Sequence, residues 1–551
     1  MKKALICLCL AFIIILTSCD IGLSFNGPSR SPEKNSQNTT EKSTLDSDFE
    51  ANTQTNTEQG TDKPDDTPDK PTPPSASDDH SDIDDNGICD DCGESVIVAI
   101  DFYAINDLHG KFSDTASNIG VDELTTYLKN CRDIYDDYFV FLSSGDMWQG
   151  GSESNLTKGL IITDWLNHLG AESMTLGNHE FDWGEEYISA NAELAQFPLL
   201  AINVYEHATN TLADYCSPSV IIERGGIQIG IIGAIGDCYS SIAPDHTKEI
   251  YFKTGNDLTS LVKAESQRLR SLGVDYIVYS IHDGYSQSKS GVTSVSSQQL
   301  SSYYDASLSE GGYVDLVFEG HTHANYVLTD SYGVYHLQNG GDNRGISHAE
   351  ININFANWNS KVNVAEFISG DTYSFLPDDP IVDELREKYK DTIALGDQII
   401  GNNSYYRNST YLRQLVADLY FEKGLDIWGD KYDISLGGGF ISIRSPYHLE
   451  SGPIKYSQLQ SLFPFDNQLV LCSVSGYDLR KKFIETSNTD YFISYEPGFT
   501  SNINDSATYY IIVDSYTSTY APNKLTEIER YDFDIFARDL LADYIASGGM
   551  S

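Results

Sequence analysis

Five short motifs rich in Asp, Asn and His occur along the middle of the chain, and each follows a run of apolar residues. Their carboxylate and amide oxygens and imidazole nitrogens suit Zn, Mn or Fe, rather than soft thiolate chemistry. A single His, or a single GD pair, is typical of an ordinary turn whose polar side chains bond to the backbone. Five in succession predict a site for two divalent metal ions. In chain order they are 106-NDLHG-110, 145-GD-146, 177-GNHEFD-182, 282-HDG-284 and 320-GHTH-323.

Short apolar runs with the length and composition of buried β-strands recur from residue 96 on, each followed by turn residues, and helix-like stretches such as 122–128 and 258–272 lie between them. This alternation predicts a layered α/β domain. Active sites in such sheets assemble at the carboxyl ends of the strands, so we expect the motifs to meet at one site. The runs are 96–105, 138–144, 227–235, 275–281 and 313–319.

The five motifs, in this order over about residues 96–350, resemble those of the calcineurin-like metallophosphatases and, within them, the bacterial 5′-nucleotidase family. The resemblance implies an α/β (α+β) fold. Its expected parts are a four-layer α/β/β/α metallophosphatase sandwich at residues 95–360, a linker with a helix at 361–397 and a second α/β nucleotide-binding domain at 398–551.

The resemblance also assigns metal ligands among the motif residues. Asp146 would bridge the two ions, and His323 stands where some 5′-nucleotidases have Gln, a difference that bears on metal preference. The ligands of one ion would be Asp107, His109 and His323, and those of the other Asn178, His282 and His321.

Catalytic roles follow from the same resemblance. In such sites two divalent ions about 3.5–4 Å apart activate a water molecule for in-line attack on phosphorus and stabilise charge on the phosphoryl oxygens. His179 would face the phosphoryl group or the leaving oxygen, and Asp182 would orient its ring. Their i, i+3 spacing is compatible with one helical turn that places both side chains on one face.

The C-terminal region resembles the nucleotide-binding domain of the same family. By resemblance, Phe465 and Tyr516 would stack on the two faces of a base with Asn467 beside it, although both aromatics also fit a plain core role. The family often has an Arg two residues after the glycines, whereas here Phe440 follows Gly439 and the next Arg is Arg444. Further expected substrate contacts are the backbone of Gly438 and Gly439 and, on the carboxylate or ribose side, Arg444 and Arg407.

The N-terminus has the pattern of an exported protein. Lys2 and Lys3 precede an apolar run at 4–16, which is too short to span a bilayer. The residues up to Cys19 resemble a lipobox, so we expect a signal peptide over 1–19, lipidation of Cys19 and attachment to the outer face of the bacterial cell membrane. The alternative is an ordinary signal peptide with a chance Cys.

Two acidic segments follow. Residues 20–77 are rich in Ser, Thr, Pro and acidic residues, a composition that predicts a disordered tether. Residues 78–94 read DDHSDIDDNGICDDCGE and leave several interpretations open. The spacing from Asp82 resembles the start of a calcium loop, without its final bidentate acid. His80, Cys89 and Cys92 offer three zinc ligands, and a solvated turn or a Cys89–Cys92 disulfide is the remaining alternative.

The net charge of the 551-residue chain is −46 at pH 7. Such a surface excludes a general nucleic-acid binder, which needs basic residues to neutralise phosphates, and it opposes charge-driven adsorption to anionic membranes. Two metal ions would still attract a small phosphate ester. A small-molecule nucleotide is therefore the expected partner.

We expect a cell-surface, metal-dependent phosphoesterase that converts nucleoside 5′-monophosphates to nucleoside and phosphate. The enzymatic alternatives are a 2′,3′-cyclic-nucleotide phosphodiesterase/3′-nucleotidase and a UDP-sugar hydrolase, which share both domains. A surface nucleotide-binding or adhesion protein is the non-enzymatic alternative. The complete metal set argues against it, since mere binding has no need of His179 and Asp182.

Overall fold

The computed structural model describes residues 80–550, apart from 114–119, 287–293, 445 and 532–535. The described residues belong to one compact unit, 71–551. Cys19, the signal peptide and the tether predicted for 1–77 lie outside the described residues. Within the described ranges, no helix is both long enough and apolar enough to cross a membrane.

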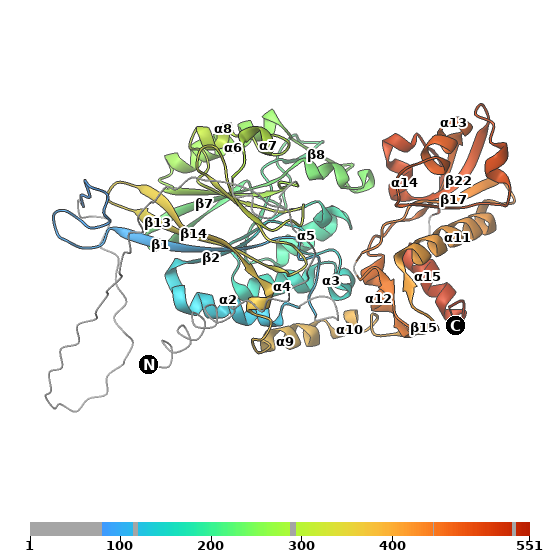
Figure 1. Ribbon diagram of the computed structural model, residues 1–551, viewed down its shortest axis with the longest axis horizontal. Coiled ribbons are helices and arrows are strands. Elements are labelled where there is room, and N and C mark those ends of the chain that lie inside the picture. Colours follow the sequence, from blue (N-terminus) through green and yellow to red (C-terminus); the bar gives the residue numbers. More distant parts are fainter. Residues whose placement is uncertain (1–79, 114–119, 287–293, 445, 532–535, 551) are drawn as a thin grey trace, which may run out of the picture. The chain divides into compact units, whose positions relative to one another are not determined.

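Two six-stranded sheets form the centre of the first domain (Figure 1). The first has the order β14-β13-β1-β2-β3-β4, and the second has the order β11-β12-β10-β9-β7-β6. The strands of the first sheet are β1 Ile97–Ile105, β2 Phe139–Ser143, β3 Ser173–Thr175, β4 Leu199–Leu200, β13 Gly345–Asn354 and β14 Asn359–Ser369. Those of the second are β6 Ser219–Arg224, β7 Ile227–Ile235, β9 Tyr276–His282, β10 Leu316–Glu319, β11 Tyr326–Thr329 and β12 Tyr335–Gln338.

Side chains alternate between two cores along β1, because successive residues of a strand point to opposite faces of the sheet. Phe102 and Ala104 belong to the core between the two sheets, together with Val278 and Phe318 of the second sheet. Tyr103 and Ile105 lie in a separate core under the helices that cover the first sheet. Buried strands of this kind read as continuous apolar runs in the sequence.

Helices cover the outer face of each sheet, which completes the predicted four-layer α/β/β/α sandwich and confirms the fold class. Figure 1 shows α2 and α4 on one side of the strands and α6, α7 and α8 on the other. The helices are α2 Asp122–Tyr135, α3 Ser152–Thr157, α4 Leu160–Leu169, α5 Glu185–Leu194, α6 Asn256–Ser271, α7 Ser297–Leu300 and α8 Ser307–Glu310. A small two-stranded sheet joins β5 Val204–Glu206 to β8 Ile250–Phe252.

The helix predicted between the domains is divided into α9, Pro380–Lys388, and α10, Lys390–Ile393. Asp379 caps α9 by accepting a hydrogen bond from the backbone N–H of Ile381. Val382 and Leu385 belong to the core beneath the first sheet. The expected linker therefore packs on the first domain, and β14 runs on to Ser369, past the expected boundary at 360.

The second domain has a five-stranded sheet of order β21-β17-β22-β20-β23 with α11 packed against β17 and β21. Gly437 of β17 permits this packing, since a Cβ there would lie 2.4 Å from the backbone nitrogen of Phe421. The sheet strands are β17 Ile434–Phe440, β20 Leu469–Ser475, β21 Tyr491–Ser494, β22 Thr508–Asp514 and β23 Thr526–Arg530. The helices are α11 Ser409–Trp428, α12 Tyr456–Leu462, α13 Gly476–Leu479, α14 Ser515–Thr519 and α15 Ala537–Ala546. Short pairs join β15 Ile399–Asn403 to β19 Gly452–Lys455 and β16 Arg407–Asn408 to β18 His448–Leu449.

Candidate active site

The predicted metal ligands come together at the carboxyl ends of strands from both sheets. In the first sheet β1, β2 and β3 run parallel, and in the second β9 and β10 do so. Each motif directly follows one of these five strands, so both sheets deliver their polar side chains to one place. The seven residues brought there are Asp107, His109, Asp146, Asn178, His282, His321 and His323.

Most of these residues have a backbone that only glycine adopts without strain. Five of the seven have φ between 50° and 70°. Non-glycine residues in this left-handed region cost free energy and persist where the surrounding structure enforces them, commonly at functional sites. The strained backbone therefore indicates that these loops serve to direct the five side chains toward the site. The five are Asp107, His109, Asp146, His321 and His323.

Two imidazoles are oriented by backbone carbonyls. Nδ1 of His109 lies 3.1 Å from the carbonyl oxygen of Gln149, and Nδ1 of His282 lies 2.7 Å from that of Ser144. A proton on each Nδ1 satisfies these bonds and leaves a lone pair on Nε2. Histidines that bind a metal through one nitrogen commonly donate the N–H of the other in this way.

Distances between the potential ligand atoms fit two neighbouring cations. Two donors bound at about 2.1 Å to one ion lie about 3 Å apart. Nε2 of His323 lies 3.0 Å from Nε2 of His109 and 3.2 Å from Oδ1 of Asp107. On the other side, Oδ1 of Asn178 lies 3.0 Å from Nδ1 of His321. The first set is one of the predicted ligand groups, and the second pair belongs to the other, whose His282 has its Nε2 3.1 Å from Oδ2 of Asp146.

Unpartnered polar atoms and local charge also indicate cations. Oδ1 of Asp107 and Nε2 of His282 are buried and make no hydrogen bond among the described residues; they face other candidate ligand atoms, Nε2 of His323 at 3.2 Å and Oδ2 of Asp146 at 3.1 Å. Burial lowers the pKa of His282, but the carboxylates of Asp146 and Asp107 outweigh it and raise that pKa to about 10. The cluster thus attracts positive charge strongly, and its residues fit two divalent metal ions.

Glu180, within the GNHEFD motif, holds two of the ligand loops in position. Its buried carboxylate accepts hydrogen bonds from the backbone N–H groups of Asp146 and Met147, each at 2.8 Å, and of Gly177 at 2.7 Å. Charge-assisted bonds of this kind are strong in a buried setting. Glu180 was not predicted as a site residue, although its place in the motif was a signal for it.

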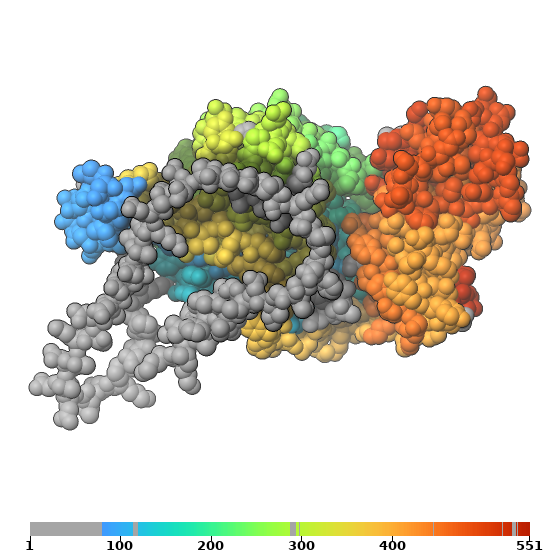
Figure 2. Space-filling view, viewed as in Figure 1, coloured from blue at the N-terminus to red at the C-terminus, as the bar shows by residue number. Residues whose placement is uncertain are grey.

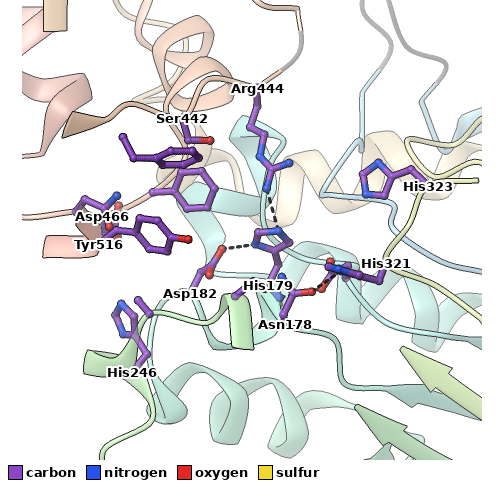
Figure 3. A pocket seen from close by; sticks show the side chains of 16 residues that line it. Asn178, His179, Asp182, His246, His321, His323, Ser442, Arg444, Asp466 and Tyr516 are labelled. Carbon is purple, nitrogen blue, oxygen red and sulfur yellow. Dashed lines mark hydrogen bonds and ion pairs between the residues drawn. The ribbon is translucent and has the colours of Figure 1, made fainter. Parts of the chain in front are cut away.

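His179 stands between a carboxylate and a guanidinium (Figure 3). It lies in a short 3₁₀ turn at His179–Phe181, and its Nδ1–H donates to Oδ2 of Asp182 at 2.7 Å. On the other side Nη2 of Arg444 donates to Nε2 of His179 at 2.9 Å. The predicted His179–Asp182 pair is therefore present, and Arg444 of the second domain reaches it.

A pocket of about 330 Å³ opens beside His179. Phe465, Tyr516 and Asn467, predicted to contact a base, all line it. Phe465 lies with its ring centroid 6.0 Å from that of His179 and carries the guanidinium of Arg444 over its ring. Volume and lining suit a small aromatic ligand with a charged end. The site side contributes Asp146, Asn178, His179, Asp182, His321 and His323, and the second domain also contributes Phe440, Ser442, Arg444 and Asp466.

Three predicted substrate contacts lie outside this pocket. A Cβ at Gly438 would clash with the carbonyl oxygen of Phe492, and one at Gly439 would clash with Thr517. These glycines thus serve close packing inside the second domain, rather than approach to a ligand. Arg407 stacks on Tyr405 and Tyr411, and it does not line the pocket either.

Several pocket residues were not predicted from the sequence. Phe440 was noted only as a departure from the family pattern, yet its ring lines the pocket 5.6 Å from that of Tyr516. Ser241, Ala243 and His246 come from a loop without a motif, so no local signal marked them. Asp466, between two predicted residues, pairs with Lys158 of the first domain at 2.7 Å.

The sequence is similar to those of known phosphoesterases, apyrases and 5′-nucleotidases. The calcineurin-like phosphoesterase family matches residues 100–325. An apyrase from Tabanus yao is 26% identical over 424 residues, which cover 71% of this chain and 72% of the relative. A probable 5′-nucleotidase from Treponema pallidum is 25% identical over 399 residues, covering 62% of this chain and 65% of the relative.

A solved structure shares the fold of both domains. The putative 5′-nucleotidase from Staphylococcus aureus superposes with a TM-score of 0.62 at 17% identity, covering 82% of this chain and 97% of that one. The family match, the curated relatives and the converging site residues lead to one conclusion. The chain is a phosphate ester hydrolase: its residues 100–325 match the calcineurin-like phosphoesterase family, and its relatives include 5′-nucleotidases.

Proposed function

We propose that this protein hydrolyses nucleoside 5′-monophosphates to nucleoside and phosphate, using two divalent ions such as Zn²⁺ or Mn²⁺. One observation carries the proposal: a single pocket has phosphoryl-transfer residues on one side and aromatic side chains on the other. His179 and Asp146 come from the first domain, and Phe465 and Tyr516 come from the second. This pairing suits a phosphate joined to an aromatic base.

The seven candidate ligands would hold the ions, which when bound supply an activated water and neutralise the phosphoryl oxygens. The chain's own cationic group there is Arg444. Its Nη2 reaches His179, and its Nε is buried without a hydrogen-bond partner among the described residues. A guanidinium with an unused donor can bind a phosphoryl oxygen and stabilise the charge that develops in the transition state.

His179 is placed to protonate the leaving oxygen. Burial lowers the pKa of this imidazole, but the carboxylates of Asp182 and Asp146 outweigh burial and raise the pKa above 6.5. When Arg444 bonds to a phosphoryl group instead of to His179, Nε2 of His179 is free to carry a proton. It can then give that proton to the 5′ oxygen of the leaving nucleoside. Asp182 keeps the ring in the orientation for this transfer.

The second domain would select for a base. Phe465 and Tyr516 are both half-buried, so part of each ring faces the pocket. A base gains stacking energy on such rings whatever its identity, since every base has a π-face. Asn467 offers a polar contact at the base edge. We expect activity on several nucleotides rather than on one.

The location belongs to the proposal as well. The lipobox-like residues that end at Cys19 favour a lipoprotein on the outer face of the cell membrane, and the acidic segment at 20–77 would act as its tether. An enzyme in this position would act on nucleotides outside the cell.

Phosphate release from a substrate panel tests the activity. The panel includes nucleoside 5′- and 3′-monophosphates, a 2′,3′-cyclic nucleotide, a UDP-sugar and a nucleoside diphosphate, each with Mn²⁺, Zn²⁺ or chelator. The diphosphate is included because some relatives are named apyrases. We expect metal-dependent release that is fastest from 5′-monophosphates. Faster release from another class would replace the proposed substrate, and no release from any would contradict the enzymatic role.

A further inference from the structure

A second cluster of metal-binding side chains lies before β1, in the segment of residues 80–95. The segment folds back on itself through a bridge between Ile88 and Ser95 and a turn in which the N–H of Gly93 donates to the carbonyl of Cys89 at 2.8 Å. It forms the blue projection in the space-filling view (Figure 2). Cys89 and Cys92 lie in this turn as a Cys-x-x-Cys pair.

The side chain of His80 completes a three-residue cluster with these cysteines. The ligand atoms of His80, Cys89 and Cys92 all lie within 4.8 Å of one another. Nδ1 of His80 is 3.6 Å from Sγ of Cys92. On a tetrahedral zinc ion, with Zn–S about 2.3 Å and Zn–N about 2.0–2.1 Å, a sulfur and a nitrogen ligand lie about 3.5–3.6 Å apart. The observed separation matches this value.

The surrounding chain holds the cluster in place. The backbone N–H of Cys89 donates to the carbonyl of Glu94 at 2.8 Å, that of Asp90 donates to the carbonyl of Ser81 at 2.7 Å, and Cys89 is 2% exposed. The ring of His80 packs edge-on against Phe355, with ring centroids 5.5 Å apart. Its Nε2 is buried and has no hydrogen-bond partner in the described part of the chain, so Nδ1 is the nitrogen presented to the sulfurs.

The calcium-loop and disulfide interpretations of this segment fit the structure less well than a zinc site. The oxygens of Asp82, first in the calcium-loop pattern, accept hydrogen bonds from the backbone N–H groups of Asn86 and Gly87 and from the side chain of Asn354. Asp82 therefore holds a turn together and fixes it to Asn354, at the end of β13. Cys89 and Cys92 are both free thiols.

We propose that His80, Cys89 and Cys92 form a third metal site, separate from the active site, for a thiophilic divalent cation such as Zn²⁺, with water as the fourth ligand. Cys92 is exposed, which leaves room for that water. The ion would clamp the segment against Asn354 and Phe355 and so fix the point at which the predicted tether meets the first domain. Such a bound ion adds its binding free energy to the stability of the segment.

Metal content of the full-length chain tests this proposal. The wild type and Cys92→Ser are loaded with Zn²⁺, freed of excess metal and analysed for zinc per chain. We expect Cys92→Ser to lose one equivalent, while the buried thiol variant Cys216→Ser keeps the wild-type content. His80→Cys, which retains a metal ligand, should keep it too. With Co²⁺, the wild type should show a sulfur-to-cobalt absorption band that Cys92→Ser loses.

Phosphate release separates this site from the active site. Cys92→Ser should retain the activity of the wild type, whatever substrate proves best, because the cluster lies outside the pocket. Equal zinc content in the wild type and Cys92→Ser would overturn the proposal. A Cys89–Cys92 disulfide found by peptide mass spectrometry in the zinc-loaded chain would overturn it as well.

Discussion

Arg444 donates a hydrogen bond through Nη2 to Nε2 of His179 at 2.9 Å, although the two residues belong to different domains. The contact joins the phosphoryl-transfer side of the pocket to the side that carries the aromatic rings. Two further contacts between the domains lie nearby, since Lys158 pairs with Asp466 and Asn155 donates to the carbonyl of Gln460. The second domain thus brings a cationic side chain to His179 as well as aromatic rings to the pocket.

Arg444→Ala should lower kcat for a nucleoside 5′-monophosphate by about 10²–10³-fold, as expected when a donor to developing oxygen charge is removed. Arg444→Lys should restore only part of this, because a lysine lacks the planar pair of donors. Steady-state kinetics measure the effect. Arg407→Ala is the matched control and should stay close to wild type, since Arg407 lies outside the pocket. A large loss in Arg407→Ala, with none in Arg444→Ala, would reverse the assignment.

Phe465→Ala and Tyr516→Ala should each raise KM for nucleotides, because a base loses about 1–3 kcal/mol of stacking on each ring. The comparison substrate is glycerol phosphate, which has no base. Its kcat/KM should change little in either variant. Equal losses for both substrates would show that the rings support the fold of the site rather than bind the base.

Glu180→Gln should weaken metal binding by about 10–100-fold, the usual effect of disturbing a group that positions the ligands. The glutamine NH₂ would face the backbone N–H groups of Asp146 and Gly177, donor against donor. Calorimetric titration of the metal-free chain with Mn²⁺ measures the change. The matched control is Glu265→Gln on α6, a buried glutamate paired with Arg268. Glu265→Gln should bind Mn²⁺ like the wild type. If the two variants bind Mn²⁺ equally well, Glu180 does not position the metal ligands.

His348 links two strands of the first sheet and should make stability depend on pH. Burial lowers its pKa, but Asp101 and Glu366 outweigh burial and raise it to about 9, above the ordinary 6.5. The stabilisation is complete below pH 6.5 and is lost as the pH rises through about 9. The shift corresponds to roughly 3 kcal/mol.

Denaturant unfolding of the metal-free chain measures this contribution. The free energy of unfolding of the wild type should exceed that of His348→Asn by more at pH 6 than at pH 10. Asp101→Asn removes the carboxylate that His348 contacts at 2.9 Å and should flatten the same pH dependence. A gap between wild type and His348→Asn that grows toward pH 10 would contradict the assigned direction.

The strands and the meeting of the five motifs at one place could be predicted because their signals are local. The apolar run 227–235 coincides with β7, and the family match covers the five motifs. Loop geometry was not visible in the sequence. Gly438 and Gly439 looked like ligand contacts, yet their missing side chains make room for Phe492 and Thr517.

The pocket depends on contacts between distant segments, and the sequence could not supply these. His246 and Phe440 line the same pocket from different domains, and neither was predicted to contact a ligand. Arg444 was expected near a carboxylate or ribose. Its bond to His179 arises only when the two domains meet.

Phosphate release by His179→Ala is the most direct test of the account. The wild type and the variant are loaded to equal metal content and assayed on a nucleoside 5′-monophosphate near neutral pH. The account predicts metal-dependent turnover by the wild type and a rate about 10²–10⁴-fold lower in the variant, since the proton donor to the leaving oxygen is gone. Equal rates at equal metal content, or no turnover by the metal-loaded wild type, would contradict it.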